Sequence, residues 1–511
     1  MNHTLFFSIF LFIIGLFAPL NMLGLSKTFC DPRLYVAMSL CLLLIRYKKS
    51  FNKKINEIEK LIPFAIGSIF LHSLVYKYLS WLSVDISGYD YSHYDYAIWN
   101  ISQGNGAFLS VAKNEGFFFV NVLGTHFRPV LYLLSIPQIL LNSHFYVFFL
   151  QSSSVLFSMV ILNKICEEIF PNNSLTKMFF VIGAGFNLYY LSVFKFVFQP
   201  EIFYIPLSFL LVYFVFKVNT IGLVLTSIVF LTIKEDAPLL LLSVWGMYIV
   251  FGKSFKTTLT GIISITSCVT YYLVVTKYVM PDYQLWPSSS FVSLWAKYGT
   301  SMVGIVKGAL LNPHLVFVDI LTNKSLYLLL LSLAFMPILT PLIFVSTISV
   351  VILTTASYPQ LNQFGVYYAS YVVGFFYICA LFGVANLKRF HTPIVALVVM
   401  SGMLMGLGKY ALPKPNITLF NEIKQMQDYF DTGCQDVYVS GNMLHVLDYS
   451  ESIRRFSSID DAIQNACQIV LLKETNSVPI TSDDHAKLLE AVRSKFSKID
   501  YESDAIIFAS R

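Results

Sequence analysis

The apolar run from Leu61 to Leu82, LIPFAIGSIFLHSLVYKYLSWL, decides the fold class of this chain. It is long enough for a helix to cross a bilayer, which takes ~20 residues for ~30 Å of hydrocarbon. The chain has 511 residues, 56% of them hydrophobic and 13% charged, and a mean hydropathy of +0.66, whereas soluble domains carry roughly a quarter charged residues. The alternating pattern of an outer-membrane barrel is absent. We therefore expect an α-helical polytopic membrane protein.

Similar apolar runs recur through residues 1–408, and counting them gives about 13 spans. The first run, Leu5 to Leu23, has neither a basic n-region nor a small-residue cleavage site, so we expect it to be a retained span. Basic residues between Arg46 and Lys60 place that loop in the cytoplasm by the positive-inside rule. Residues 84–143 and 281–324 are then large extracytoplasmic loops of a protein of the plasma or inner membrane.

Three polar clusters fall on the extracytoplasmic face when the spans are counted from that loop. They contain Asp95, then Glu201, then Glu235 with Asp236. Polar groups of this kind are costly beside a membrane and mark functional sites there. The sequence therefore predicts one site, facing outward, built from all three clusters.

The composition changes from Lys409 onward, where charged and polar residues are frequent. We expect residues 409–511 to form a small extracytoplasmic α/β domain, because the last basic anchor, Lys388 with Arg389, comes one span earlier. Its expected elements are strands at 436–440, 468–472 and 505–509 and a helix at 483–497. Cys434 and Cys467 share this domain. Whether they form a disulfide depends on their geometry and on the compartment.

The segment from Gly88 to Asn100 carries the two aspartates on which the chemistry depends. Asp90 and Asp95 lie among aromatic residues, and Trp99 and Asn100 follow one turn after Asp95. A helix beginning near Ser92 would hold Asp95 in its first turn, where the helix dipole stabilises a carboxylate, so that the aspartates could serve only for capping or ion pairing. The alternative is a general base that takes a proton from an acceptor hydroxyl.

The other polar residues also admit two interpretations each. Arg128 could pair with a phosphate or anchor to lipid headgroups, and His126 beside it could simply be hydrogen-bonded in a loop. Lys234-Glu235-Asp236 indicates either a polar cavity lined by protein or an exposed turn between spans. Glu201, after Gln199 and Pro200, could bind substrate or cap a helix.

At these residues the chain resembles the predicted-membrane-protein family catalogued as domain of unknown function 2079. The similar segments are Tyr94 to Asn100 followed by Gly104, His126 to Pro129, Phe198 to Glu201, Lys234 to Pro238 and Val439 to Asn442. Two positions where that family usually has histidine depart from its pattern. They lie in the Gln199 turn and at Tyr367, and we assign them no metal or proton role.

That family in turn resembles the GT-C superfamily of membrane glycosyltransferases, which take sugars from polyprenyl-phosphate donors. The resemblance implies a GT-C-like fold in which Asp95 or Asp90 is the base. It also implies transfer of a sugar from polyprenyl phosphate to an extracytoplasmic acceptor.

Our hypothesis is therefore a glycosyltransferase embedded in the lipid bilayer. In it Asp95 is the base, Asp90 is its partner or a metal ligand, and Arg128 and Lys234 face the donor phosphate. The other residues expected to bind substrate are His126, Gln199, Glu201, Glu235, Asp236, Trp99 and Asn100. The sequence leaves open whether a divalent cation is needed. The alternative is a transporter or scaffold for lipid-linked envelope precursors. Nucleic acid is not an expected partner, because the basic residues do not form a stripe.

Overall fold

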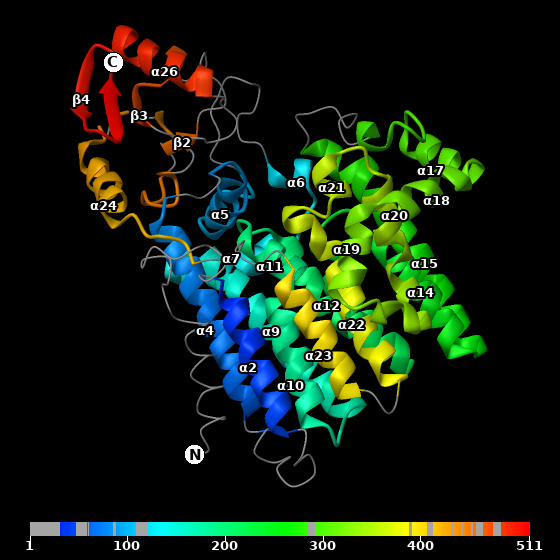
Figure 1. The fold of residues 1–511 in the computed structure, drawn as a ribbon. Helices are drawn as coiled ribbons and strands as arrows, with labels where there is room; N and C mark the ends of the chain where they lie inside the picture. Colours follow the sequence, from blue (N-terminus) through cyan, green and yellow to red (C-terminus); the bar gives the residue numbers. More distant parts are fainter. Residues whose placement is uncertain are drawn as a thin grey trace.

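The computed structural model describes most of the chain as helix, with a small sheet near the C-terminus (Figure 1). It describes residues 31–47, 59, 61–84, 88–108, 121–283, 292–387, 391–405, 412–431, 433–434, 436–440, 443–450, 453–455, 463–464, 466–473 and 482–511. The expected first span, the basic residues 48–54 and Lys60, Lys388 with Arg389, and the boundary at 408/409 lie outside these residues. The side chain of Asp90 also lies outside them.

The helices of the bundle run in chain order from Pro32 to Leu404. The α-helices are α2 (Pro32–Tyr47), α4 (Leu61–Leu82), α5 (Gly88–Ser102), α6 (Val122–Thr125), α7 (Val130–Ser135), α8 (Gln138–Leu141), α9 (Phe145–Ile169), α10 (Ser174–Phe186), α11 (Leu188–Lys195), α12 (Tyr204–Lys217), α13 (Thr220–Leu231), α14 (Ala237–Gly252), α15 (Phe255–Val274), α17 (Met302–Leu311), α18 (Pro313–Thr322), α19 (Lys324–Ser332), α20 (Thr347–Thr355), α21 (Pro359–Asn362), α22 (Ser370–Ala385) and α23 (His391–Leu404). Short helices include η2 (Pro200–Phe203), η6 (Met336–Leu339), η7 (Pro341–Ser346) and η8 (Val366–Ala369).

Within the described residues, 5 helices are long and apolar enough to cross a membrane, or up to 7 if each bent pair is one span. Shorter apolar helices such as α13 and α14 pack beside them. The expected count of about 13 spans stays a prediction. One of the two bent pairs consists of α10 and α11, which meet at an angle of 43°. Asn187 caps α11 at the bend, where its side chain accepts a hydrogen bond from the backbone of Tyr189.

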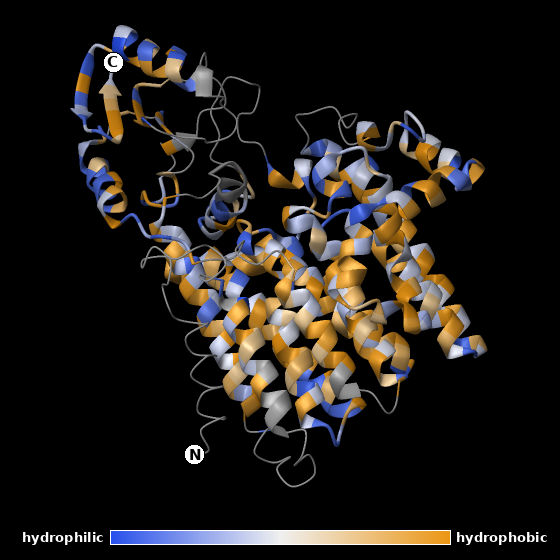
Figure 2. Ribbon diagram, in the orientation of Figure 1, coloured by the Kyte–Doolittle hydropathy of each residue, from blue (hydrophilic) through white to orange (hydrophobic). Residues whose placement is uncertain are grey.

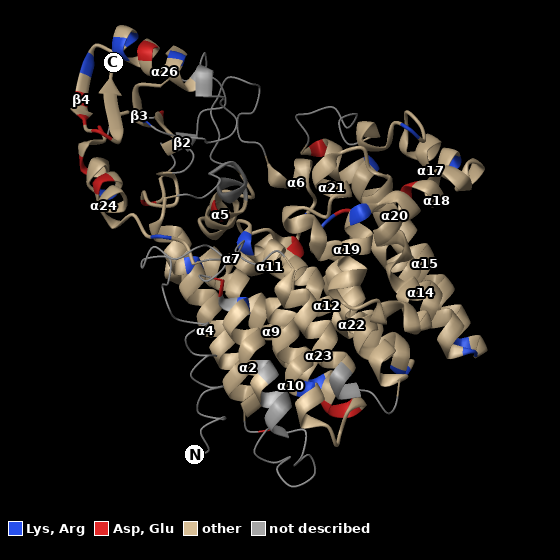
Figure 3. Ribbon diagram, in the orientation of Figure 1, with Lys and Arg blue, Asp and Glu red and all other residues tan. Residues whose placement is uncertain are grey.

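Burial separates the central helices from those that face lipid. The span that contains α22 is 89% buried, whereas the span that contains α15 is only 17% buried. Leucine, isoleucine and valine side chains on α13 and α15 are exposed, among them Ile221 and Ile263. Figure 2 shows that the helical bundle is largely hydrophobic, and Figure 3 shows that most of its charged residues lie near its two ends. This distribution is the one that a bilayer requires.

The C-terminal part forms an α/β unit, as expected. Its elements are α24 (Ile417–Met426), η9 (Gln427–Tyr429), β1 (Val437–Val439), β2 (Ile453–Arg455), β3 (Gln468–Leu472), α26 (Ser482–Lys495), β4 (Lys498–Glu502) and β5 (Ile506–Ser510). The strand order is β2-β1-β3-β5-β4, with β1 parallel to β2 and β3, and β5 antiparallel to β3 and β4. The sequence predicted β1, β3, β5 and α26 to within two residues and missed β2 and β4.

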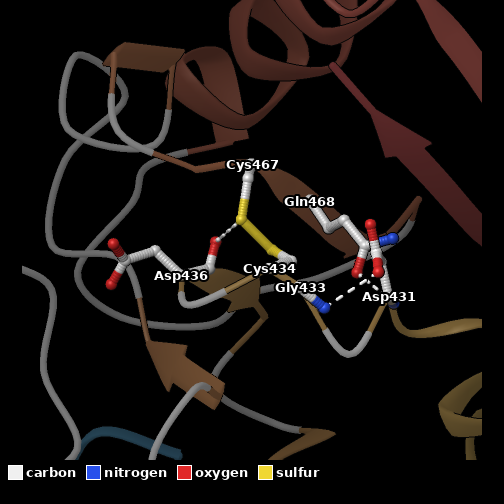
Figure 4. The surroundings of a disulfide bond; sticks show 6 residues. All are labelled: Asp431, Gly433, Cys434, Asp436, Cys467 and Gln468. Atoms are coloured by element: carbon white, nitrogen blue, oxygen red, sulfur yellow. Dashed lines mark hydrogen bonds between the residues drawn. A yellow bond between two sulfur atoms is a disulfide. The ribbon is translucent and has the colours of Figure 1, made fainter.

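A disulfide joins Cys434 to Cys467, whose Cα atoms lie 5.9 Å apart (Figure 4). It ties the segment before β1 to the residue before β3. The Sγ atom of Cys467 lies 3.5 Å from the carbonyl oxygen of Asp436. The bond that the sequence left open is therefore present in the structure.

Side chains on the two faces of the sheet belong to different apolar cores. One face packs on α26 through residues such as Ile469 and Leu488. The other face carries Val470 and Phe508, and its core also contains Tyr96 and Trp99 of α5. Helix α5 therefore lies between the helical bundle and the C-terminal unit and packs on both (Figure 1).

Candidate active site

Helix α5 positions Asp95 well inside a helix rather than at its start. The helix begins at Gly88, not near Ser92, so Asp95 lies about two turns in. The dipole effect is confined to the first turn. The interpretation of Asp95 as a carboxylate stabilised at a helix start is therefore wrong.

Asp95 is 1% exposed and each of its carboxylate oxygens has a partner. The Nδ1 atom of His144, at the start of α9, lies 2.5 Å from Oδ2. The hydroxyl of Tyr449, from the C-terminal unit, donates to Oδ1 over 2.6 Å. An ionised carboxylate has no proton to donate and accepts both bonds. In sequence, His144 is 49 residues from Asp95 and Tyr449 is 354 residues from it.

Trp99 completes this arrangement. Its indole stacks on the ring of Tyr449, with centroids 5.1 Å apart and planes 4° apart. Its Nε1 donates to the side chain of Asn142 over 3.1 Å. We call Asp95, Trp99, His144 and Tyr449 the Asp95 cluster. Asn100 is not part of it, because its side chain donates to the carbonyl of Phe108 and closes the end of α5.

Six predicted site residues form a second group, the charged cluster. Its members are His126, Arg128, Glu201, Lys234, Glu235 and Asp236. Arg128 donates from its two terminal nitrogens to both oxygens of Glu201, each over 2.7 Å, and neither side chain is exposed. Arg128 is therefore not a lipid-headgroup anchor, and Glu201 does more than start a short helix.

Lys234 lies on the other side of Glu201. Its Nζ is 3.3 Å from Glu201 Oε1 and 3.6 Å from Asp236 Oδ2. It also donates to the hydroxyl of Tyr371 over 2.9 Å, and that hydroxyl donates to Asp236 over 2.5 Å. Tyr204 donates to the second oxygen of Asp236 over 3.1 Å. The charged side chain of Lys234 is thus buried among protein groups. The interpretation of Lys234-Glu235-Asp236 as an exposed turn between spans is therefore wrong for Lys234.

His126 and Glu235 form the edge of the charged cluster. The Nδ1 atom of His126 lies 2.8 Å from Glu235, whose other oxygen accepts the backbone N–H of Phe127 over 3.0 Å. Burial lowers the pKa of His126 well below its usual value, and the neighbouring Lys234 and Arg128 add to this effect. Burial also raises the pKa values of Glu235 and Asp236, although Lys234 opposes the shift in both. His126 is therefore a neutral imidazole that can form hydrogen bonds but takes up a further proton only weakly here.

Tyr94 joins the two clusters. Its ring lies under the guanidinium of Arg128, 4.4 Å from centroid to carbon, and Asp95 is the next residue of α5. The structure thus brings all three predicted polar clusters to the same end of the bundle. Gln199 directly precedes η2, the short helix that contains Glu201. Its side chain is buried, and its Oε1 accepts no hydrogen bond from any described residue.

Sequence reasoning missed His144, Tyr449, Tyr371 and Tyr204. His144 carried a usable signal, since it is a polar residue at the start of the apolar run that becomes α9. Tyr449 carried none. Among the residues that the structure describes, no three His, Cys, Asp or Glu side chains are placed to hold a metal ion.

One family model matches this chain over residues 82–465, which include both clusters. It is the family described as "Predicted membrane protein (DUF2079)". The chain belongs to this family. No curated protein matches the chain.

Two solved structures show a distant overall likeness to this family member. One is the crystal structure of ArnT from Cupriavidus metallidurans bound to undecaprenyl phosphate, with a TM-score of 0.49 and 9% identity over 86% of this chain and 97% of that one. The other is the Archaeoglobus fulgidus oligosaccharyltransferase in complex with Zn and sulfate, with a TM-score of 0.40 and 11% identity over 80% of this chain and 68% of that one. At these scores the likeness carries no argument about activity.

Proposed function

We propose that this protein is a membrane glycosyltransferase that moves a sugar from a polyprenyl-phosphate donor to an acceptor hydroxyl on the extracytoplasmic side. The observation that carries the proposal is the buried Asp95 carboxylate, which is held by Nδ1 of His144 and lies one residue away from a tyrosine that stacks on Arg128. A positioned base beside a cationic group is what a displacement at a sugar phosphate requires.

The reaction is a single displacement with inversion at the sugar carbon. Asp95 takes the proton of the acceptor hydroxyl as its oxygen forms a bond to that carbon. The bond from the sugar carbon to the phosphate oxygen breaks, and the polyprenyl phosphate leaves with the electron pair. Lys234 offsets the charge that develops on the leaving group.

The two cations have different capacities for this task. Both terminal nitrogens of Arg128 are committed to Glu201, whereas its buried Nε has no partner among the described residues. Lys234 has three donors, of which one goes to Tyr371 and one is within 3.3 Å of Glu201. We therefore assign Lys234 to the donor phosphate and give Arg128 the role of holding Glu201 and Tyr94 in place.

The test is the Asp95→Asn variant, assayed for transfer from a radiolabelled polyprenyl-phosphate sugar in membranes. The amide keeps the shape but cannot take the proton, so the rate should fall by ~10²–10⁴-fold. Asp448→Asn, which makes the same change at an exposed position in the C-terminal unit, should leave transfer unchanged. Near-normal transfer with asparagine at both 90 and 95 would leave the proposed enzyme without a base. That result would favour the transport or scaffold alternative.

A further inference from the structure

We infer that Asp95, Trp99 and Gln138 form a subsite for a sugar ring of the acceptor, and that Tyr449 occupies this subsite in the present structure. The inference rests on the proposed function, because it names the acceptor class of the same site. It makes the C-terminal unit a gate over the acceptor site.

The ring of Tyr449 packs against Trp99, His144 and Tyr96. Three of the contacts of Tyr449 are those that a sugar ring would make. Its flat ring stacks on the indole of Trp99, as the C–H face of a pyranose packs on a large apolar ring. Its hydroxyl donates to Asp95 over 2.6 Å, in the place where an acceptor hydroxyl would give up its proton. The same hydroxyl accepts a hydrogen bond from Gln138 Nε2 over 2.9 Å.

Gln138 supplies a separate sign that a further ligand fits here. The residue is 1% exposed, yet its Oε1 accepts no hydrogen bond from any residue that the structure describes. A buried acceptor without a donor is costly. Tyrosine has one hydroxyl, whereas a sugar has adjacent hydroxyls. One of these could bond Asp95 and Gln138 Nε2 while its neighbour donates to Oε1.

The subsite itself belongs to the membrane part of the chain and does not depend on Tyr449. Asp95 and Trp99 lie on α5, Gln138 begins α8, and Asn142 at the end of α8 holds the indole in place. Only the occupant comes from the C-terminal unit. Because Asp95 is buried, an acceptor can reach it only after Tyr449 has moved away.

A binding experiment tests the subsite without relying on transfer. The full chain in nanodiscs is mixed with the methyl glycosides of glucose, galactose and mannose, and binding is measured by saturation-transfer difference NMR. Tyr449→Ala should bind at least one glycoside at least tenfold more tightly than the unaltered chain. Tyr449→Ala/Trp99→Ala should lose that binding. Tyr429→Ala, the same change at an exposed tyrosine of the C-terminal unit, should behave like the unaltered chain.

Tyr449→Phe is a second test in case Tyr449→Ala does not fold. It keeps the aromatic ring and removes only the hydroxyl. Without the bond to a carboxylate the ring is displaced more easily, so glycoside binding should still tighten, by roughly fivefold or more. If neither variant binds any of the three glycosides more tightly, the inference is overturned.

Kinetics separate this inference from the alternative that Tyr449 positions Asp95. As an occupant, Tyr449 raises the acceptor KM, so Tyr449→Phe should lower KM at unchanged kcat. A positioning residue would instead lower kcat when altered and shift the pH profile of kcat. If the unaltered chain transfers sugar but the Tyr449 variants bind no glycoside more tightly, the subsite is contradicted and the proposed function is not. Glycoside binding by these variants without any transfer by the unaltered chain would support the subsite and contradict the proposed function.

Discussion

Arg128 and Glu201 form a bidentate ion pair, with both N–O distances at 2.7 Å and neither side chain exposed. The two residues are 73 positions apart in sequence, so the pair joins the segment before α7 to the short helix η2. Lys234 adds a second cation 3.3 Å from the same carboxylate. The pair therefore organises the charged cluster.

We expect Glu201→Gln to destabilise the protein severely. It leaves the Arg128 guanidinium buried without its counter-charge, and breaking such a pair costs about 3–5 kcal/mol. The measurement is the free energy of unfolding of the detergent-solubilised chain, followed by denaturant titration.

The double variant Arg128→Met/Glu201→Leu is the control for that loss. It removes both charges together and fills the space with apolar groups, so much of the lost stability should return. Transfer should not return, because Arg128 and Glu201 no longer hold Tyr94 and Lys234 in place. Equal stability of the single and double variants would contradict the assignment of the cost to an unpaired charge.

The sequence predicted the charged cluster because its residues interrupt apolar runs. Lys234, Glu235 and Asp236 separate two spans, and the cost of placing charges there makes such an interruption easy to see. Counting spans then placed them on the same face as Arg128 and Glu201. The ion pair between Arg128 and Glu201 could not be predicted, because two residues 73 positions apart leave no local pattern in the sequence.

The contact between Tyr449 and Asp95 could not be predicted from the sequence for the same reason. It lies 354 residues from Asp95, in a unit whose own elements the sequence largely predicted. The strands β1 and β3 are buried apolar runs and were found, whereas the charged edge strand β4 has exposed residues at Lys498 and Ile499 and was missed. The way in which two units dock depends on matching surfaces, which periodicity does not encode.

The docking of the C-terminal unit should weaken in mild acid. His445 Nε2 lies 3.1 Å from the carbonyl oxygen of Trp81, whose indole donates to the carbonyl of His445 over 2.8 Å. Burial, with a contribution from His144, lowers the pKa of His445 to about 3, against the effect of its backbone hydrogen bond. The unfolded value is about 6.5.

Stability from His445 is therefore complete above pH ~6.5 and is lost as the pH falls toward 3, because only the released histidine takes up a proton. Between pH 7 and pH 5 the loss of stability should be about 2 kcal/mol.

Proteolysis of the C-terminal unit in the full chain measures this loss of stability. His445→Phe should show a smaller pH dependence, and His314→Phe, at an exposed histidine of α18, should show the dependence of the unaltered chain. Identical pH dependence in all three would contradict the role of His445.

Removal of the Cys434–Cys467 disulfide should destabilise the C-terminal unit by about 2–5 kcal/mol, because the bond closes a loop with a sequence separation of 33 residues. The measurement is proteolysis of the full chain with alanine at both positions. Reductant should destabilise the unaltered chain by the same amount and should have no effect on the double variant. A reductant effect of equal size on both would show that another cysteine is responsible.

The disulfide also bears on which side of the membrane the C-terminal unit lies. Disulfides persist in oxidising compartments, so we expect this unit and Asp95, which is bonded to it through Tyr449, to be extracytoplasmic. A cysteine engineered at Asp483 in α26 should react with a membrane-impermeant maleimide in intact cells. A cysteine at Lys164, which lies in α9 near the opposite end of the bundle and is exposed, should react only after the cytoplasm is opened. The two sites must give opposite results, because α9 runs from His144 beside Asp95 across the bundle to Ile169. Labelling of the Asp483 site only in opened cells would reverse the orientation and place the proposed transfer in the cytoplasm.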